Sequence, residues 1–537
     1  MSDEPEIYDV AVVGYGPVGA VLAILLGQQG RRVVVLERHH EPYPLPRAVH
    51  FDHEINRILQ SCGVAEEVSA IVEPAEVYDF LTADRRPLMR VGRVGRGLSG
   101  WPQSSMFSQP QLEQVLFDRV DALPSVEVRR GVAVTNLVEE DGAVLVESEG
   151  VGRSEPVRAR YVVGCDGANS TVRHLLGLAM VDKAFFYDWL IVDVVFDEPR
   201  VYDPVNFQVC DPARPTTVVS GGPGRRRWEF MALPGETAVE LDDEAMAWRL
   251  LEPWDARPDN CTLERHAVYR FQARWLEEWR RGRVLLAGDA AHQTPPFAGQ
   301  GMCAGMRDAA NLAWKLDAVL RGMAPDALLD TYGIERAPNM EAVIGVAMDM
   351  GGLICVTDPD EAAARDEAFT AVFDGSVSEI PPFPGIADGV VLAGTPQAGE
   401  LFLQAEVEAG GRRALLDDVV GGGWRLVISE PGVADGLDPA LARWFEDLGG
   451  AVVTVVAAGA AGLTGDRAGA APGSEPSAAA TTVVDVDGTY GSWFATHGVV
   501  AALQRPDFAV FGTAPAAADV DGLLAALRDV LAAPAGR

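Results

Sequence analysis

The sequence predicts an α/β fold in which a Rossmann-like nucleotide-binding domain is split by an inserted antiparallel sheet and followed by a separate C-terminal domain. A buried strand, a glycine-rich turn and a helix open the chain within residues 8–29. Strand-like runs separated by Pro, Gly and Asp fill residues 181–280, and the buried-strand pattern returns at 283–287. Such a pattern is typical of a parallel sheet whose chain is interrupted by a second sheet. The expected ranges are 1–180 and 281–380 for the split domain, 181–280 for the inserted sheet, 381–400 for a linker and 401–537 for the C-terminal domain.

The first element is a βαβ unit built around Gly14, Gly16 and Gly19, with Glu37 at the end of its second strand. The glycines permit a tight turn, and the helix N-terminus supplies N–H donors to a pyrophosphate. A carboxylate at the position of Glu37 accepts hydrogen bonds from ribose hydroxyls and repels a 2′-phosphate, so NADP is not expected as the resident. The spacing therefore predicts a dinucleotide site, with glycines that serve only packing as the alternative. The expected elements are a strand at 8–13, a helix at 17–29 and a strand at 32–36.

Two later segments favour FAD over NAD as that dinucleotide. Residues 158–165 lead as a buried strand into Asp166, and residues 283–287 lead into Gly288 and Asp289. An Asp at the end of such a strand can hold a ribityl hydroxyl, and the alternative is a helix N-cap. Both segments after a Rossmann-like start form a more specific pattern than either alone. The other elements expected in this domain are a helix at 110–122, strands within 125–149 and a long helix at 301–321.

The C-terminal part is expected to be a third α/β unit. Strands are expected at 424–428 and 451–456, and a terminal helix at 519–532. Residues 457–481 are rich in Ala, Gly and Ser, which predicts a surface loop. This unit has no C-x-x-C pair, and disulfide exchange needs a thiolate that attacks a paired sulfur. Its expected role is therefore packing or dimer contacts.

Composition excludes several classes of partner. The chain has 537 residues, and 78 Asp and Glu stand against 44 Lys and Arg, which gives a formal net charge of −34. This charge argues against nucleic acid and against an anionic membrane surface as partners. The glycines of the first turn interrupt the apolar stretch 10–27, so no membrane span is expected. Six cysteines without C-x-x-C spacing predict a reducing compartment, the cytoplasm, and no metal site is expected.

These motifs together resemble those of the single-component (group A) flavin aromatic hydroxylases, such as para-hydroxybenzoate hydroxylase and phenol hydroxylase. The resemblance covers nearly the whole chain and is closest to 3-(3-hydroxyphenyl)propionate hydroxylase and its polyketide-tailoring relatives. It implies bound FAD, an inserted substrate-binding sheet as in para-hydroxybenzoate hydroxylase, and a thioredoxin-like C-terminal domain. The segments that carry it are GYGPVG at 14–19, PRAVHFD at 46–52, FSQPQLEQVL at 107–116, the Asp166-Gly167 and Gly288-Asp289 turns, and PPFAGQGMCAGMRDAANLAWKL at 295–316.

The resemblance implies contacts to each part of FAD. The pyrophosphate would lie on the glycine turn, the adenosine ribose on Glu37 and the ribityl chain on Asp289. The helix that begins near Gly301 would point its N-terminus at the flavin N1–C2=O edge, where N–H groups stabilise the anionic reduced ring. Cys303 stands where the family often has Asn, so only backbone contacts are expected there. The expected cofactor-binding residues are Gly14, Gly16, Gly19, Glu37, Arg38, Arg47, Gln109, Asp166, Asp289, Pro296, Gly299, Gln300, Gly301 and Met302.

The activity implied by the resemblance is hydroxylation of a phenolic or other aromatic ring. NAD(P)H would reduce FAD, and O2 would then form a flavin C4a-hydroperoxide that attacks the ring. A base that deprotonates the phenol would help, and His50 is the first candidate, with a structural histidine as the alternative. Arg47 and Pro296 are expected beside the flavin as further catalytic residues. The candidates for substrate binding are His50, Trp101, Phe207, Arg227 and Tyr269, with core packing or a solvated charge run as the alternatives.

Two other functions fit the same motifs. A polyketide-tailoring enzyme that performs Baeyer–Villiger oxidation or epoxidation would use the same scaffold, and a non-catalytic FAD- or ligand-binding protein would keep the cofactor motifs. No second Rossmann fingerprint is present, so NADH or NADPH is expected to bind transiently, and the sequence leaves the choice between them open. A homodimer also stays open.

Overall fold

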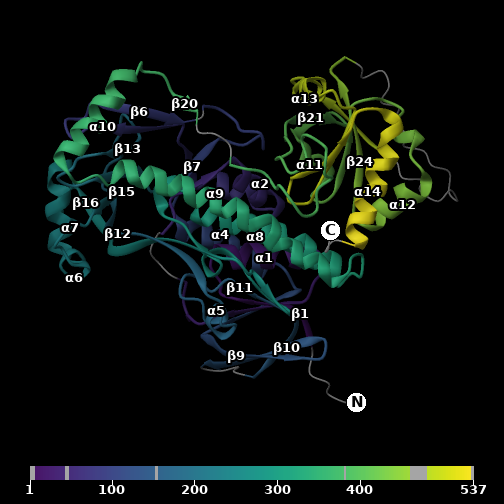
Figure 1. Ribbon diagram of the computed structural model, residues 1–537, viewed down its shortest axis with the longest axis horizontal. Helices are drawn as coiled ribbons and strands as arrows, with labels where there is room; N and C mark the ends of the chain where they lie inside the picture. The colour runs from purple at the N-terminus through teal and green to yellow at the C-terminus, as the bar shows by residue number, and fades with distance from the viewer. Residues whose placement is uncertain are drawn as a thin grey trace. The chain divides into compact units, whose positions relative to one another are not determined.

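The computed structural model describes residues 7–42, 47–92, 94–150, 155–379, 383–459 and 480–533, and the chain forms two compact units (Figure 1). The first unit comprises Met1–Gly97, Pro102–Ala309 and Met340–Phe383; the second comprises Leu98–Trp101, Ala310–Asn339 and Pro384–Arg537. Most of the loop expected at 457–481 lies outside the described residues, as do Pro46 and residues 381–382 of the expected linker. The four sequence-based domain ranges remain predictions.

A mostly parallel sheet forms the part of the first unit in which the sequence predicts the dinucleotide site. Its order is β17-β18-β11-β1-β2-β8, and a hairpin of β9 and β10 is attached to β11. β18 pairs in parallel with β11, although the chain between them also builds another sheet. The strands are β1 Ile7–Val13, β2 Val33–Glu37, β8 Val126–Arg130, β9 Val132–Glu140, β10 Ala143–Gly150, β11 Val157–Gly164, β17 Arg280–Arg281 and β18 Val284–Leu286. The accompanying helices are α1 Pro17–Gln28, α2 His53–Ser61, α3 Ala65–Ser69, α4 Gln109–Asp121 and α5 Thr171–Leu175.

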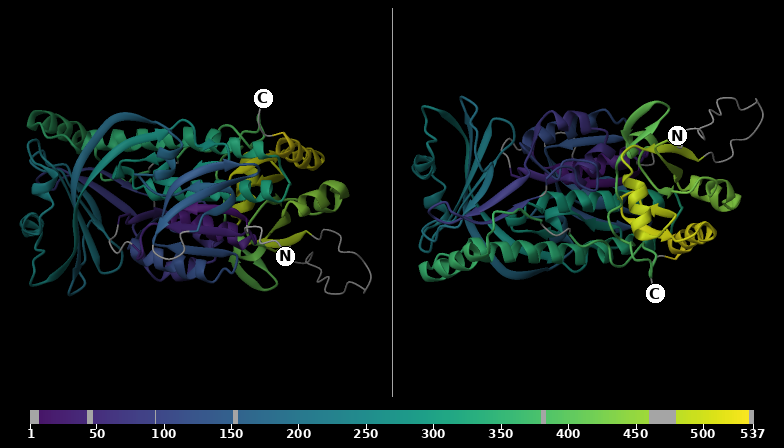
Figure 2. Two further views of the ribbon diagram at one scale, coloured as in Figure 1. Left: turned by 90° about the horizontal axis from the view of Figure 1, so that it is seen from below. Right: turned by 90° about the horizontal axis from the view of Figure 1, so that it is seen from above.

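A mainly antiparallel sheet forms a second layer of the same unit, drawn as mostly teal strands in Figure 2. Its two longest strands, β12 Met180–Phe196 and β16 Cys261–Leu276, pair along most of their length. The order is β19-β16-β12-β15-β14-β13-β5-β6-β20, so the sheet also takes strands from outside residues 181–280. The remaining strands are β5 Val77–Leu81, β6 Pro87–Gly92, β13 Asn206–Val209, β14 Thr216–Ser220, β15 Arg225–Met231, β19 His292–Gln293 and β20 Ser378–Glu379. The same unit contains two short helices, α6 Ala238–Leu241 and α7 Glu244–Leu251. It also contains a three-stranded sheet of β3 His50–Asp52, β4 Val72–Pro74 and β7 Ser104–Phe107.

Three helices follow the cofactor motifs. α8 spans Gly301–Leu320, as the sequence predicts, whereas α9 (Thr331–Ile354) and α10 (Pro359–Val372) were not anticipated. α9 contains Pro338, and a proline in the sequence normally predicts the end of a helix or a kink. No single described helix is long and apolar enough to cross a membrane, although one bent pair, Asp326–Ile354 with Pro359–Val372, meets the test by length and composition.

The second unit contains a seven-stranded sheet of order β22-β21-β25-β24-β23-β26-β27. β23, β24 and β25 run parallel, and β26 and β27 continue the sheet as an antiparallel hairpin. The strands are β21 Glu406–Ala409, β22 Arg412–Leu415, β23 Arg425–Ile428, β24 Ala451–Ala457, β25 Thr481–Asp485, β26 Ala501–Gln504 and β27 Val510–Ala514. The helices are α11 Leu416–Val420, α12 Pro439–Asp447, α13 Thr489–His497 and α14 Val520–Ala532.

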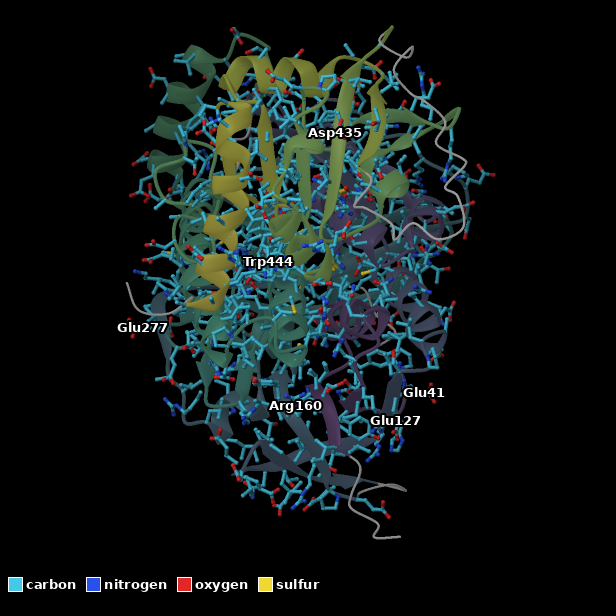
Figure 3. All side chains as sticks on the ribbon, turned by 90° about the vertical axis from the view of Figure 1, so that its right-hand side faces the viewer. Glu41, Glu127, Arg160, Glu277, Asp435 and Trp444 are labelled. Carbon is cyan, nitrogen blue, oxygen red and sulfur yellow. The ribbon has the colours of Figure 1, made fainter. Side chains whose placement is uncertain are left out.

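Acidic side chains lie on the surface of both units. Glu41, Glu277 and Asp435, labelled in Figure 3, are exposed. All six cysteines are free thiols. No group of metal-ligating side chains occurs among the residues that the structure describes.

Candidate functional site

The glycine turn after β1 leaves the start of α1 open. Gly14 has a φ of +102°, and a Cβ there would lie 2.4 Å from the Cys165 carbonyl oxygen. A Cβ on Gly19 would lie 2.2 Å from the Gly14 carbonyl oxygen, whereas a Cβ on Gly16 would meet nothing within 4 Å. Gly16 is the N-cap of α1, and no side chain caps the helix. The start of α1 is therefore uncapped and has open space at Gly16, which is an arrangement that suits a phosphate.

Glu37 joins the glycine turn to the end of β2. The Tyr15 N–H donates to Glu37 Oε2 at 2.8 Å, and the His39 N–H donates to Oε1 at 2.8 Å. Each carboxylate oxygen keeps a further lone pair for a ribose hydroxyl. Arg38 is exposed, and its Nε lies 3.1 Å from His39 Nε2. Its predicted contact with the cofactor stays a prediction.

The loop that carries Arg47 is held from two sides. Gln109, at the start of α4, accepts hydrogen bonds through Oε1 from the Arg47 and Ala48 N–H groups, at 3.2 and 2.8 Å. Gln109 Nε2 donates to Glu113 Oε1 at 2.6 Å, and burial raises the pKa of Glu113. On the other side, Arg227 Nη1 of β15 donates to the Arg47 carbonyl oxygen at 2.5 Å. The antiparallel sheet thus fixes a loop that the sequence predicts beside the flavin.

The Asp166 segment is a capped turn linked to the Asp289 segment. Asp166 Oδ1 accepts from Ser170 Oγ at 2.5 Å, and Oδ2 accepts from the Val172 N–H at 3.1 Å. Arg173 Nη1 donates to the Ala290 carbonyl oxygen at 3.0 Å. Ser170, not Asp166, is the N-cap of α5, because its Oγ accepts from the Arg173 N–H at 2.9 Å. Asp166 supports this cap, and its remaining lone pairs leave room for a cofactor contact.

Asp289 follows β18 and is solvent-accessible, yet desolvation by the surrounding chain raises the pKa of its carboxyl. The positive charge of Arg47 opposes that shift. The turn beneath it is rigid, because Asp308 Oδ2 accepts from the Gly288 N–H at 3.0 Å and contacts His292 Nε2 at 2.6 Å. Asp289 is thus presented by a fixed backbone, as a ribityl ligand requires.

The turn that leads into α8 leaves a second open helix start. Pro296–Ala298 form a 3-10 turn, and Gly299 follows with a φ of +63°. A Cβ on Gly301 would meet nothing within 4 Å. Gln300 is buried, and its Oε1 accepts from Arg307 Nη1 at 2.9 Å. The backbone at Gly301 is therefore available to a planar ring.

His50 lies against that turn. Its Nδ1 is 3.3 Å from the Gly299 carbonyl oxygen, and burial lowers the pKa of the imidazole. Because a carbonyl oxygen only accepts, Nδ1 carries the proton and Nε2 of the neutral ring is a proton acceptor. Met302 is half-buried, and burial raises the pKa of the Cys303 thiol, which argues against a reactive thiolate.

One face of the antiparallel sheet carries an aromatic wall. Trp189 of β12 and Tyr269 of β16 are register partners, so their side chains lie on the same face. Phe297, in the 3-10 turn Pro296–Ala298, packs on this face. Its ring centroid lies 5.8 Å from that of Trp189 and 6.0 Å from that of Phe271. The turn predicted beside the flavin and the sheet predicted to bind substrate therefore meet through aromatic side chains.

Four charged residues lie on the same face, next to the aromatic wall. Arg227 donates to both oxygens of Asp193, at 2.7 and 3.0 Å. Glu229 Oε1 lies 3.8 Å from Arg227 Nη1, and Arg265 Nη1 lies 3.9 Å from Asp193 Oδ2. The Arg265 guanidinium also lies over the Tyr269 ring, 4.7 Å from its centroid. Asp193, Glu229 and Arg265 were not among the sequence-based candidates, although a charge within the apolar run around Asp193 was a usable signal.

The other substrate candidates lie elsewhere. Phe207 pairs with Val218, and Val218 pairs with Trp228, on the face opposite to Arg227. Phe207 there belongs to a hydrophobic core that includes Trp228. Trp101 belongs to the second unit. Arg227 and Tyr269 are the two candidates that the sheet brings to one face.

Comparisons with known proteins agree with this arrangement. A family model described as an FAD binding domain matches residues 7–347, and one described as an HcaD C-terminal domain matches residues 399–530. A probable NADH-specific resorcinol 4-hydroxylase of Rhodococcus jostii (strain RHA1) is 39% identical over 520 residues, which cover 96% of this chain and 93% of that protein. A 3-(3-hydroxy-phenyl)propionate/3-hydroxycinnamic acid hydroxylase of Mycolicibacterium smegmatis (strain ATCC 700084 / mc(2)155) is 36% identical over 438 residues, 79% of this chain and 77% of that protein.

Two solved structures resemble the fold over nearly its whole length. The flavin-dependent monooxygenase PieE, in complex with FAD and substrate, matches with a TM-score of 0.79 and 22% identity over 98% of this chain and 99% of its own. Aklavinone-11 hydroxylase, in a ternary complex with FAD and aklavinone, matches with a TM-score of 0.76 and 25% identity over 98% of this chain and 100% of its own. The predicted fold class is thereby confirmed.

Proposed function

The chain belongs to the FAD binding domain family and is an FAD-dependent aromatic hydroxylase, and from that premise we propose that it hydroxylates a single-ring phenol with NADH and O2. The observation that carries the proposal is the match, over nearly the full length of both chains, with a relative named for NADH and resorcinol. The sheet face beside the flavin-side turn supports it, because aromatic side chains and buried charges suit a ring with phenolic oxygens.

The residues present fit FAD. The open start of α1 at Gly16 suits the pyrophosphate, Glu37 the adenosine ribose, and Asp289 the ribityl chain. The open space at Gly301 suits the isoalloxazine. When bound, FAD accepts a hydride from the nicotinamide and activates O2.

The chain's own residues orient the substrate and handle protons. Arg47 and Pro296 border the ring of the cofactor in this proposal, and His50 offers Nε2 as a proton acceptor at the same turn. Trp189, Tyr269 and Phe297 form the wall that holds the substrate ring and excludes water.

The test is a turnover assay on the purified, FAD-loaded protein. Resorcinol is expected to stimulate NADH oxidation several-fold over the basal rate and to yield a product heavier by one oxygen atom, with NADPH the weaker reductant. FAD binding without phenol-stimulated NADH oxidation would overturn the proposal in favour of a non-catalytic protein.

A polyketide-tailoring role is the second candidate, because the chain shares its fold with aklavinone-11 hydroxylase. The resorcinol 4-hydroxylase relative is more similar in sequence, 39% against 25%, which favours a small substrate. Turnover of a polycyclic aromatic polyketide but not of resorcinol or 3-(3-hydroxyphenyl)propionate would support the tailoring role.

The proposal places the enzyme in the cytoplasm, where NADH is available and the six free thiols stay reduced. A homodimer is part of the same proposal, and the molecular mass of the FAD-loaded protein in solution tests it.

A further inference from the structure

Arg265 is buried with unused hydrogen-bond donors. Its side chain is 1% exposed, and its Nε, Nη1 and Nη2 have no hydrogen-bond partner among the residues that the structure describes. Arg265 forms an ion pair with Asp193 at 3.9 Å and stacks over the Tyr269 ring. A buried guanidinium with unsatisfied donors is costly, so the folded protein gains when a ligand with anionic oxygens occupies them.

The neighbouring charges do not satisfy Arg265. Asp193 directs both of its oxygens to Arg227 at 2.7 and 3.0 Å, and Arg227 also donates to the Arg47 carbonyl oxygen. Asp193 and Arg227 therefore form a closed pair that positions the flavin-side loop. Arg265 keeps the longer ion pair with Asp193, at 3.9 Å, and makes no hydrogen bond to it.

Glu229 is the complementary group. Its side chain is 13% exposed and lies on the same face. The charged and titratable groups around it are Arg227 on its own strand, Asp193 on β12, Arg265 on β16 and Tyr78 on β5. Burial and the negative charge of Asp193 raise the pKa of Glu229, while the two arginines oppose the shift. Burial favours the neutral form of the carboxyl, so a proton is transferred to Glu229 more easily than to an exposed carboxylate.

We propose that Glu229 and Arg265 together form the site that binds the substrate hydroxyl as a phenolate. The phenol O–H bond breaks, its proton passes to a Glu229 carboxylate oxygen, and the electron pair stays on the phenolate oxygen, which Arg265 binds. This inference rests on the proposed function, because it assigns the phenol to this face.

Charge balance supports the assignment. Before transfer, Asp193 and Glu229 balance Arg227 and Arg265. After transfer, the phenolate replaces Glu229 as the partner of Arg265, so no net charge is created inside the protein. The site is also placed for the reaction, because the Asp193–Arg227 pair reaches the Arg47 loop and the aromatic wall beside Arg265 reaches Phe297.

Glu229→Gln and Arg265→Met test the site, with Arg265→Lys as a second variant that keeps the charge. Glu264→Gln is the matched control, because Glu264 pairs with Arg225 at 3.4 Å on the same sheet without taking part in the cluster. Three quantities are measured on the FAD-loaded proteins: the FAD content, the Kd of resorcinol from the change in the flavin spectrum, and the ultraviolet difference spectrum of bound phenolate. Each is measured from about pH 6 to pH 10, because a free phenol such as the Tyr side chain ionises near pH 10.

With Arg265→Met, FAD content is expected to be retained while the Kd of resorcinol rises by about tenfold or more, as for loss of a charge-assisted bond. With Glu229→Gln, the phenolate band of bound resorcinol is expected to vanish at pH 7, and hydroxylation is expected to recover as rising pH supplies free phenolate.

This inference would be overturned, and the proposed function left intact, if all three variants kept the wild-type Kd, pH profile and phenolate band. The variants are Glu229→Gln, Arg265→Met and Arg265→Lys. Absence of phenol-stimulated NADH oxidation in the wild type would instead overturn the proposed function. If only Arg265→Met loses FAD, the test rests on Arg265→Lys and Glu229→Gln. A changed resorcinol Kd or phenolate band in these two variants supports the site, and wild-type values contradict it.

Discussion

Gly14 and Gly16 have different surroundings, and this separates two demands on the nucleotide turn. Gly14 needs to be glycine for the protein itself, because of its positive φ and its approach to the Cys165 backbone. Gly16 has free space where a Cβ would stand. In the proposed site, the absence of a side chain at Gly16 leaves room for the FAD pyrophosphate.

Two substitutions are expected to separate these demands. Gly14→Ala forces a side chain into a strained, crowded position and is expected to lower the unfolding free energy of the FAD-free protein by roughly 1–3 kcal/mol. Gly16→Ala is expected to leave that free energy unchanged and to weaken FAD binding by about tenfold, or 1.4 kcal/mol. Urea unfolding and FAD titration measure the two effects. Equal behaviour of the two variants in both measurements would contradict the assignment of Gly16 to the pyrophosphate.

At the scale of elements, β15 serves two partners through alternate residues. Arg227 faces the flavin side and holds the Arg47 loop, whereas Trp228 faces the opposite core. A strand has a period of two, so neighbouring residues of β15 have unrelated tasks. The sheet that is proposed to bind substrate therefore also supports the loop that is proposed to border the cofactor.

Arg227→Lys is expected to weaken FAD binding by about tenfold, because an ammonium cannot reproduce the two-point pairing with Asp193 while also holding the Arg47 carbonyl. Arg225→Lys on the same strand is the matched control, since Arg225 pairs at 3.4 Å with half-buried Glu264. The Kd of FAD measures both variants. Equal Kd values would show that the Arg47 loop needs no support from the sheet.

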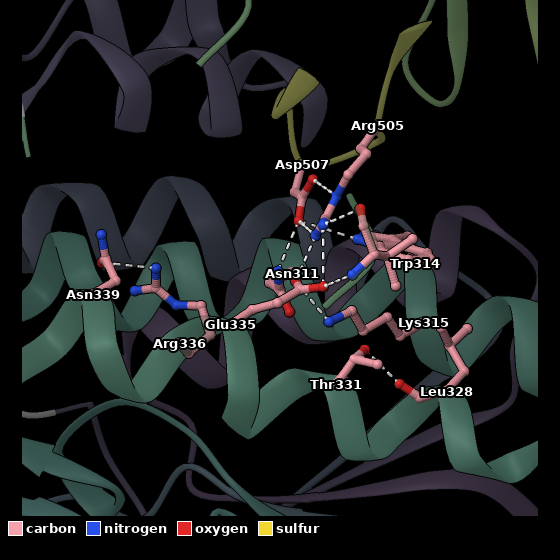
Figure 4. Close-up of polar contacts among 11 residues, drawn as sticks. Asn311, Trp314, Lys315, Leu328, Thr331, Glu335, Arg336, Asn339, Arg505 and Asp507 are labelled. Carbon is pink, nitrogen blue, oxygen red and sulfur yellow. Dashed lines mark hydrogen bonds and ion pairs between the residues drawn. The ribbon is translucent and has the colours of Figure 1, made fainter. Parts of the chain in front are cut away.

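At the scale of the whole molecule, the second unit is assembled from separated stretches of chain by a buried charge network (Figure 4). Glu335 of α9 contacts Arg505 and Lys315 at 2.6 and 2.7 Å, and all three side chains are fully buried. Asn311 donates to the same carboxylate at 2.7 Å, and Arg505 pairs with Asp507 at 2.6 Å. The two cations lower the pKa of Glu335 from 4.5 to about 2.

This network predicts a pH dependence of stability. A carboxyl whose pKa is lower in the folded protein contributes stability above its unfolded value, near 4.5, and loses it as pH falls toward 2. Glu335→Gln is expected to lower the unfolding free energy at pH 7 by roughly 3–5 kcal/mol, because it leaves buried cations unpaired. The difference from wild type is expected to narrow by about 3 kcal/mol as pH falls through that window.

Urea unfolding of the FAD-loaded proteins at pH 7, 5, 4, 3 and 2 (about the range that spans the two pKa values) measures this difference. Glu408→Gln, at an exposed position of β21, is the control and is expected to match wild type throughout. A difference between Glu335→Gln and wild type that stays constant with pH would contradict the proposed role of the carboxylate charge.

The sequence by itself determined the nucleotide turn, the two Asp turns and the start of α8, because each depends on residues close together in the chain. Glycine conformations, helix starts and buried parallel strands follow local rules that a sequence displays.

Only the tertiary structure decided which residues share a site. Arg227 and Phe207 had equal standing as substrate candidates, but strand register placed them on opposite faces. The same register brought Asp193, Glu229 and Arg265 together, from three strands far apart in sequence. Register depends on packing between distant segments, and a shift of one residue moves every side chain to the other face, so no local pattern in the chain reveals it.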